Sequence, residues 1–407
     1  MMIYVLDQNG KPLMPTCRKG KVRRLLREGK AIIVKRTPFT IQLTYESGGH
    51  TQKVTLGVDT GSKKVGLSAT TTEKELFSSE VSIRTDIVEL LSSRSQSRRS
   101  RRKRLRYREA RFLNRTRSKK EGWLPPSISH KIQTHLRVIR DVHTILPISR
   151  IVVEVASFNI KKLKDEYIQG ERSNFWNVRE YVLFRDKHTC QHCKGKSRDN
   201  ILQVHHLESR KTGGDAPNNL LTLCKTCHSD YHKGKISLNV TRGKKFNHTI
   251  FMGVMRNELY KSLQDLYLNV SMTYGYITKD TRIRNGLPKE HRVDALCISE
   301  NPLAKRADVW YQQKKVRCHN RQIHKHTMLS GGRKKNNQSP YEVKGFRLFD
   351  KVLYNNKEYF VFARRITGFF RLKDLNGNSI DNGSTSFKKL ELVETRKSML
   401  VLRLVNR

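Results

Sequence analysis

Two Cys-x-x-Cys pairs, Cys190/Cys193 and Cys224/Cys227, constrain this chain more than any other feature. Four thiolates suit a closed tetrahedral site for structural Zn²⁺. The segment between them is too small for a core of its own, so metal binding would supply much of its folding energy. The odd total of seven cysteines favours a metal site in a reducing compartment over a set of disulfides. By themselves, the pairs also fit a zinc ribbon that only binds.

Histidines and an asparagine between and after these pairs add a second group of candidate ligands. His205 and His206 are neighbours in a predicted strand, so their side chains point to opposite faces. His228 and His232 are one helical turn apart and can face the same ion. Together with Asn219, these residues resemble the HNH (ββα-metal) endonuclease motif. A ribbon that only binds has no need of them.

The HNH resemblance implies a role for each of these side chains. His206 would be the general base that takes a proton from water. His205, His228 and His232 would hold the catalytic divalent ion, expected to be Mg²⁺, which acts as a Lewis acid on the scissile phosphate. Asn219 would hold the loop that carries His206.

Net charge is the strongest global signal: 82 Lys and Arg against 36 Asp and Glu give +46. Such self-repulsion favours a polyanionic partner, and nucleic acid is the obvious one. No apolar run approaches the roughly 20 residues that cross a bilayer. The N-terminus does not read as a signal peptide. We therefore expect no membrane partner and a location in the prokaryotic cytosol or nucleoid.

Three acids and a histidine form a second candidate site. Asp59 lies in a strand that runs into a glycine turn, and Glu154 lies in a buried strand over 150–158. His291 and Asp294 share one face of a helix predicted over 286–299. A carboxylate in a buried strand needs a partner, and a metal ion would serve. Asp59 alone would equally fit a turn or cap residue.

If the carboxylates of Asp59, Glu154 and Asp294 converge, cations must lie between them. Two Mg²⁺ ions about 4 Å apart would stabilise both the attacking and the leaving oxygen of a phosphodiester. His291 would assist the nucleophile. The three acids are therefore the predicted metal ligands, and with His291 they are the predicted catalytic set.

Residues 94–120 contain fourteen Lys or Arg in 27 positions and one acid, Glu109. Such a run is usually a solvated tail, but apolar residues interrupt it and folded segments flank it. We interpret it as one arginine-rich helix that binds phosphates, since the guanidinium fork suits that contact. The predicted nucleic-acid-binding residues are Arg98, Arg99, Arg101, Arg102, Arg104, Arg106, Arg108, Arg111 and Arg115.

The two ends of the chain are small modules. Residues 1–50 predict an α+β unit with a basic helix over 19–30. The quartet Pro12-Leu13-Met14-Pro15 precedes this helix. Residues 341–407 predict short strands, including 346–354, 387–392 and 400–405, in a barrel-like β module. The Cys318, His319, His324 and His326 group fits no closed metal site and favours RNA or surface contact.

The order of strand-Asp, basic helix, strand-Glu, HNH insert and His-x-x-Asp helix, together with the Pro-Leu-Met-Pro start, resembles the IscB family. The resemblance implies an α/β multidomain fold in which an RNase H-like (RuvC) core is split in three. The implied domains are a PLMP domain (1–50), RuvC part I (51–93), a bridge helix (94–120), RuvC part II (121–172), the HNH domain (173–245), RuvC part III (246–316) and a C-terminal basic linker and β module (317–407).

The family resemblance also implies a function. IscB proteins are transposon-encoded RNA-guided endonucleases, related to the type II CRISPR effectors. The expected partners are a guide non-coding RNA and a double-stranded DNA target beside a short adjacent motif, bound by a monomeric protein. HNH would cut the guide-paired strand and RuvC the displaced strand. The alternatives are a protein-only HNH endonuclease of homing or restriction type and a non-catalytic RNA-binding protein.

The C-terminal module is the candidate reader of the adjacent motif. Arg364, Arg365 and Arg371 are its candidate base-contacting residues, and the sequence does not choose among them.

Overall fold

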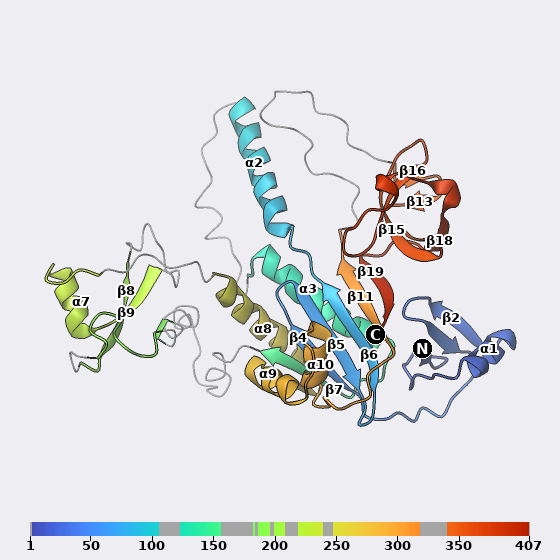
Figure 1. Cartoon of the computed structure of the whole chain (residues 1–407), viewed down its shortest axis with the longest axis horizontal. Coiled ribbons are helices and arrows are strands. Elements are labelled where there is room, and N and C mark those ends of the chain that lie inside the picture. The colour runs from blue at the N-terminus through green and yellow to red at the C-terminus, as the bar shows by residue number, and fades with distance from the viewer. Residues whose placement is uncertain are drawn as a thin grey trace. The chain divides into compact units, whose positions relative to one another are not determined.

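The computed structural model describes most of the chain in two compact units, one of residues 1–154 and 259–407 and the other of residues 155–258 (Figure 1). The described residues are 2–105, 123–155, 182–183, 186–195, 199–207, 219–238, 247–317 and 340–406. Within these ranges, no helix combines the length and the apolarity needed to cross a bilayer.

A seven-stranded sheet forms the centre of the first unit, with the strand order β10-β7-β4-β5-β6-β11-β19. β4, β5 and β6 are antiparallel neighbours, and β7 runs parallel to β4 on its other side. Their apolar residues are almost fully buried, as expected for a sheet covered on both faces. The bounds are β4 Thr55–Thr60, β5 Lys64–Thr70, β6 Glu75–Ser82, β7 Arg150–Val155, β10 Val270–Tyr274, β11 Val309–Lys315 and β19 Met399–Val405.

Two strands of this sheet correct the sequence prediction. β11 lies in a basic stretch for which the sequence predicts irregular structure, and it pairs parallel to β6. The strand expected at 400–405 exists as β19, but it is not part of the C-terminal β module. It pairs along its whole length with β11, so the end of the chain belongs to the central sheet. Sequence periodicity predicts a strand but not its distant partner.

Helices of the first unit cover the sheet and link its strands. α10 (His291–Ile298) packs on β4 and β5. The sequence predicts one strand over 272–278, but the structure divides this stretch. β10 ends at Tyr274, and α9 (Gly275–Arg284) begins at the next residue. The other helices are α3, Pro126–His143, and α8, Asn247–Leu266.

The arginine-rich helix begins earlier than predicted. α2 runs from Ile87 to Leu105 and therefore starts seven residues before position 94. Its continuation over 106–120, with Arg106, Arg108, Arg111 and Arg115, lies outside the described residues. So do Cys318, His319, His324 and His326, and most of residues 173–187, for which the sequence predicts a helix that leads to Cys190.

The N-terminal module is a three-stranded sheet in the order β1-β3-β2, with one helix packed on it. Ile3, Val22 and Ile41 form its core with their neighbours. The helix ends three residues before the predicted limit. The bounds are β1 Tyr4–Leu6, α1 Lys19–Arg27, β2 Ala31–Lys35 and β3 Thr40–Leu43.

The C-terminal module is a small, mostly antiparallel β structure, as predicted, with its own core around Val352 and Phe370. The strand expected at 346–354 is two strands, and 387–392 begins as a 3₁₀ turn. Its elements are β12 Glu342–Val343, β13 Phe346–Arg347, β14 Lys351–Tyr354, β15 Lys357–Arg364, β16 Phe369–Lys373, η4 Asp381–Gly383, β17 Thr385–Ser386, η5 Phe387–Lys389 and β18 Glu391–Glu394.

The second unit contains a two-stranded antiparallel ribbon, β8 (Leu202–His206) and β9 (Leu220–Cys224), followed directly by α7 (Lys225–His232). Its core is small: Leu221 and Leu223 pack among the cysteines, with Leu202 and Ile236 beside them. This is the ββα arrangement that the HNH resemblance implies.

Candidate metal sites

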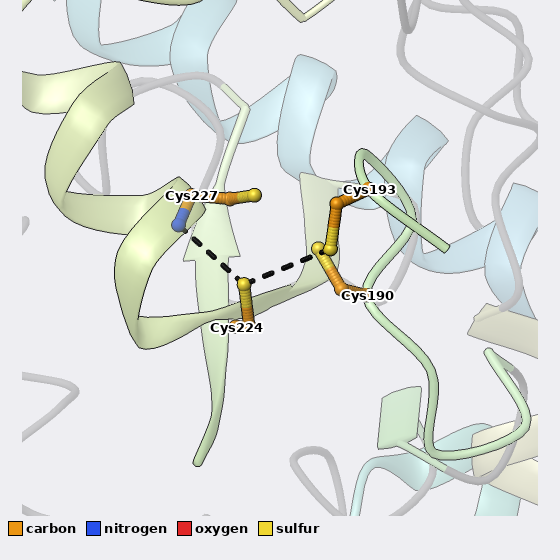
Figure 2. Close-up of side chains that lie close together, drawn as sticks. All are labelled: Cys190, Cys193, Cys224 and Cys227. Atoms are coloured by element: carbon orange, nitrogen blue, oxygen red, sulfur yellow. Dashed lines mark hydrogen bonds between the residues drawn. The ribbon is translucent and has the colours of Figure 1, made fainter. Parts of the chain in front are cut away.

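The four cysteines of the insert converge, as predicted. Cys190 and Cys193 come from a loop, whereas Cys224 and Cys227 flank the start of α7 (Figure 2). All four sulfur atoms lie within 4.8 Å of one another, and the Sγ atoms of Cys193 and Cys224 are 3.9 Å apart. A tetrahedral site with Zn–S bonds of about 2.3 Å spaces its sulfurs by about 3.8 Å. The donor set and its spacing therefore fit Zn²⁺.

Hydrogen bonds hold the two halves of the cysteine site together. The Asp199 carboxylate accepts from the backbone N–H of Ile201 and from both the N–H and the hydroxyl of Thr226, which ties the loop to the first turn of α7. These bonds keep the pKa of Asp199 below its usual value. Burial and the neighbouring sulfurs raise the pKa of the Cys227 thiol, so four thiolates here require a cation to balance them.

The histidines form a second cluster in the same unit. His205 Nδ1 lies 3.1 Å from His228 Nε2, which in turn lies 3.2 Å from His232 Nε2. Burial, and then the neighbouring histidines, lower the pKa of His205 to about 4, and burial also lowers the pKa of His228. Neutral imidazoles with converging nitrogens are what a divalent ion requires of its ligands. These three residues fit the predicted ion.

His206 and Asn219 lie beside this cluster. His206 follows His205 in β8 and pairs with Leu220 across the ribbon, so its side chain points to the opposite face from His205. Asn219 is fully buried, and its carbonyl oxygen accepts a hydrogen bond of 2.8 Å from the N–H of Leu207. That main-chain bond holds the backbone immediately after His206, and the role expected of the Asn219 side chain stays a prediction.

In the central sheet, Asp59 and Glu154 lie on adjacent parallel strands, each one residue beyond the last paired residues Val58 and Val153. The Thr60 hydroxyl donates to the Glu154 carbonyl oxygen at 2.7 Å and links the strand ends. Both acids are almost completely buried. Three of the predicted site residues, Asp59, Glu154 and His291, therefore lie near the carboxyl ends of β4 and β7, because His291 also contacts Asp59.

His291, at the start of α10, lies with Nδ1 2.6 Å from the Asp59 carboxylate. That hydrogen bond raises the pKa of His291, although burial opposes the change. Burial first, and then the charge of Asp59, raise the pKa of Asp294. Arg282 Nε, on α9, lies 3.0 Å from the Asp294 carboxylate. Two of the three acids therefore have a partly buried cationic or basic partner.

The three carboxylates do not form one tight cluster. Among the described residues, groups of three or more metal-ligating side chains converge within 4.8 Å only in the insert, and Asp59, Glu154 and Asp294 are not such a group. Their oxygens are nevertheless the hard ligands that Mg²⁺ prefers, and they lie on strands and a helix that meet. The three carboxylates are therefore suitable ligands for Mg²⁺, although their oxygens do not all lie within 4.8 Å of one another.

Two glycines that sequence reasoning passed over bring α10 onto the sheet. A Cβ on Gly66 would lie 1.8 Å from the carbonyl oxygen of His291, and a Cβ on Gly57 would lie 2.1 Å from that of Ala295. Gly66 is the direct cross-strand partner of Asp59. The signal in the sequence was a glycine inside each of two predicted strands, which indicates close backbone approach.

The arginines predicted to bind nucleic acid are only partly described. Arg98 and Arg99 are exposed on α2, and the backbone of Arg101, Arg102 and Arg104 continues the helix. Arg98 Nε donates to the carbonyl oxygen of Arg94 at 3.4 Å. An exposed run of arginines on a regular helix suits a phosphate surface.

The structure separates the three candidate arginines of the C-terminal module. Arg364 donates to the backbone carbonyls of Tyr341 and Phe346, each at 2.8 Å, and to that of Pro340 at 3.1 Å, so its guanidinium is engaged within the module. Arg365 and Arg371 instead line a hollow together with Phe369 and Asn382. Each of them donates to a serine hydroxyl, from Arg365 Nη1 to Ser384 Oγ at 3.5 Å and from Arg371 Nε to Ser379 Oγ at 3.0 Å, so they are better placed than Arg364 to present a guanidinium to a base edge.

Comparison with known families agrees with this geometry. Residues 3–174 match the family described as RRXRR protein, and residues 190–234 match the HNH endonuclease family. The chain is an IscB-like protein with an HNH endonuclease domain. The HNH match covers both the cysteine site and the histidine cluster. The predicted family is therefore confirmed, and the insert is a nuclease domain.

One curated protein resembles this IscB-like chain over a short part of its length. Anaredoxin from Nostoc sp. strain PCC 7120 is 44% identical over 39 residues, which are 9% of this chain and 51% of that protein. The chain thus spans about half the length of that curated relative.

Among solved structures, Streptococcus thermophilus Cas9 in complex with the GGAA PAM aligns with 12% identity over 45% of this chain and 26% of Cas9, at a TM-score of 0.25. The type II-C Cas9 from Actinomyces naeslundii aligns with 16% identity over 46% of this chain and 30% of that one, at a TM-score of 0.17. The chain spans less than a third of either Cas9.

Proposed function

We propose that this IscB-like protein is an RNA-guided DNA endonuclease that hydrolyses phosphodiester bonds with two metal-dependent sites. The HNH site would cut the guide-paired strand, and a RuvC site would cut the displaced strand. One observation carries the proposal: a single chain of net charge +46 has both a three-histidine cluster in an HNH domain and a buried acid set on a separate sheet. A DNA duplex has two strands, so two different sites in one chain could each cut one of them.

In the HNH site, His205, His228 and His232 would hold the divalent ion, which as a Lewis acid would stabilise charge on the scissile phosphate. His206 is the proposed general base. Its ring points away from the ligand face of β8, which leaves it able to accept a proton rather than bind the ion. Asn219 keeps the strand end in position through its backbone bond to Leu207. The four cysteines would hold structural Zn²⁺.

For the second site, the strand order of the central sheet supports an RNase H-like assignment. Three hairpin-linked antiparallel strands are followed by β7, parallel to the first of them. Asp59, Glu154 and Asp294 are the proposed Mg²⁺ ligands. His291 is the proposed proton acceptor, because it already lies in hydrogen-bond contact with Asp59 at the exposed side of the site.

The domain assignment is proposed with the boundaries given by the sequence, apart from the strand β19, which belongs to the central sheet. The arginine-rich helix is the proposed phosphate-binding bridge to the guide RNA, and the C-terminal module is the proposed reader of the short motif beside the target. In related effectors the protein reads that motif and base pairing reads the rest.

The first test is the nucleic acid that the protein carries. Protein is purified from cells that also express its native flanking DNA, and the bound nucleic acid is extracted and sequenced. One discrete RNA with a fixed structured part is the expected result. Mixed cellular RNA, or none, would instead favour a protein-only HNH endonuclease.

The second test assigns the strands. With a duplex labelled differently on each strand, His206→Ala should cut only the displaced strand, and Asp59→Ala only the guide-paired strand. If either variant still cuts both strands, the roles are wrong. If the unaltered protein cuts neither strand and both variants behave as it does, the metal sites are structural and the protein is a non-catalytic RNA-binding protein.

A further inference from the structure

Two stacked tyrosines flank the turn that carries the chain past Glu154. Tyr274 ends β10, Gly275 begins α9, and Tyr276 follows. The rings of the two tyrosines are nearly parallel, with 9° between their planes and 5.9 Å between their centroids. A Cβ on Gly275 would lie 3.3 Å from Glu154 Oε1, so the tyrosines are the chain neighbours of a residue that lies close to that carboxylate.

The two rings differ in how firmly the protein holds them. Tyr274 is half-buried, and its hydroxyl raises the pKa of Tyr260 on α8, an effect second to the burial of Tyr260 itself. Tyr276 is 63% exposed. Thr278, on the opposite face of α9, is buried and its hydroxyl donates to the Tyr274 carbonyl oxygen at 3.4 Å. α9 is therefore anchored by one face and presents the Tyr276 ring on the other.

The exposed face of α9 combines aromatic, aliphatic and cationic groups. Lys279 and Ile283 follow Tyr276 by three and seven residues, so they lie on the same side of the helix. Ile283 is 59% exposed, and Lys279 is exposed. An apolar ring with a lysine one turn away suits a partner that has flat apolar faces joined by negative charges. Unpaired nucleic acid is such a partner.

We propose that Tyr276, backed by Tyr274, is a stacking platform for a base of single-stranded DNA whose backbone enters the Asp59–Glu154 site. The proposal rests on the RuvC function proposed above and names how that site holds its substrate. A displaced strand has unpaired bases, so its bases are free to stack on the outer face of Tyr276. Lys279 binds a neighbouring phosphate. Tyr276 is a positioning residue, because it fixes the strand and does not touch the reacting atoms.

The test uses the full chain with its co-purified RNA and two probes. The probes are a short fluorescein-labelled single-stranded DNA of mixed sequence and an abasic strand of the same length, and binding is measured by fluorescence anisotropy at high salt, where phosphate contacts are weakened. Tyr276→Ala should weaken binding of the base-bearing strand by about 5- to 150-fold, the effect of one lost stacked base. Binding of the abasic strand should not change. Tyr276→Phe should behave as the unaltered protein.

Tyr45, 40% exposed in the N-terminal module, supplies a matched control, since Tyr45→Ala removes the same side chain elsewhere. In strand-specific cutting, Tyr276→Ala should slow cleavage of the displaced strand and leave the guide-paired strand unaffected. Equal losses for the two probes, or equal losses in Tyr45→Ala and Tyr276→Ala, would overturn the platform. A third outcome separates the two proposals. If Tyr276→Ala loses base-dependent binding but Asp59→Ala still cuts both strands, the platform is supported and the RuvC function is refuted.

Discussion

A methyl group on Gly66 should disable the second site and spare the first. Real Cβ atoms almost never lie closer than 3.0 Å to a neighbour, yet the added Cβ would lie 1.8 Å from the His291 carbonyl oxygen. The start of α10 must therefore retreat from β5 by at least 1.2 Å, the difference between these distances. His291 and Asp294 move with that turn. Overpacking of this kind costs about 1–3 kcal/mol, and a displacement of about 1 Å can cost roughly 100-fold in rate.

The assay compares cutting of each strand under single-turnover conditions, with thermal unfolding measured in parallel. Gly66→Ala should lower the melting temperature and cut the displaced strand about 100-fold more slowly, while the rate on the guide-paired strand is unchanged. Gly20→Ala is the matched control, because a Cβ on Gly20 in α1 meets nothing within 4 Å. If Gly66→Ala melts and cuts as the unaltered protein does, α10 does not approach β5 as described, and the link from glycine to site geometry is refuted.

Three further predictions address other parts of the chain. Cys190→Ser, or zinc chelation, should abolish cutting of the guide-paired strand and expose the insert to proteolysis, with zinc content measured by atomic absorption. Arg371→Ala should weaken binding of target duplex without lowering the melting temperature, whereas Arg364→Ala should lower the melting temperature, because its backbone carbonyl partners lose their donor. Burial lowers the pKa of His143, which stacks on Tyr267, to about 4, so the unfolded chain takes up this proton first as pH falls. Stability should therefore drop below pH 6.5, by about 2 kcal/mol at pH 5, and His143→Phe should lose this part of the acid sensitivity in urea titrations at pH 7 and pH 5.

The insert was predictable from sequence because its geometry is local. Cys-x-x-Cys spacing and a four-residue interval between His228 and His232 bring ligands together whatever the rest of the chain does. The central sheet was less predictable. β11 reads as Val-Trp-Tyr-Gln-Gln-Lys-Lys, and its buried Tyr311 and Gln313 alternate with less buried residues, a weak period-2 signal in a basic stretch. Its antiparallel partner β19 lies more than eighty residues further along the chain.

The boundary between β10 and α9 was not predicted from the sequence, for a different reason. Met272, Tyr274, Tyr276 and Ile277 continue an apolar pattern across it, and propensity alone does not end the strand at Gly275. At that glycine the chain lies close to the Glu154 carboxylate, and the two residues are about 120 positions apart in the sequence. Asp59 and Glu154 were predictable as strand residues, and His291 and Asp294 as residues of one helix face, but the contact of Arg282 with Asp294 was visible only in space.

The two sites therefore depend on different sources of stability, and this makes their roles separable. The histidine cluster lies on a ribbon and one helix whose core consists largely of the cysteines themselves, so its order should depend on the Zn²⁺ that they are proposed to bind. Asp59, Glu154 and His291 lie on strands and a helix buried in a large apolar core that includes Val58, Leu67 and Leu296. Removing zinc should dismantle the first arrangement and leave the second folded. With Mg²⁺ kept in excess, a zinc-selective chelator should therefore stop cutting of the guide-paired strand alone, and added Zn²⁺ should restore it, a reversal that no substitution allows.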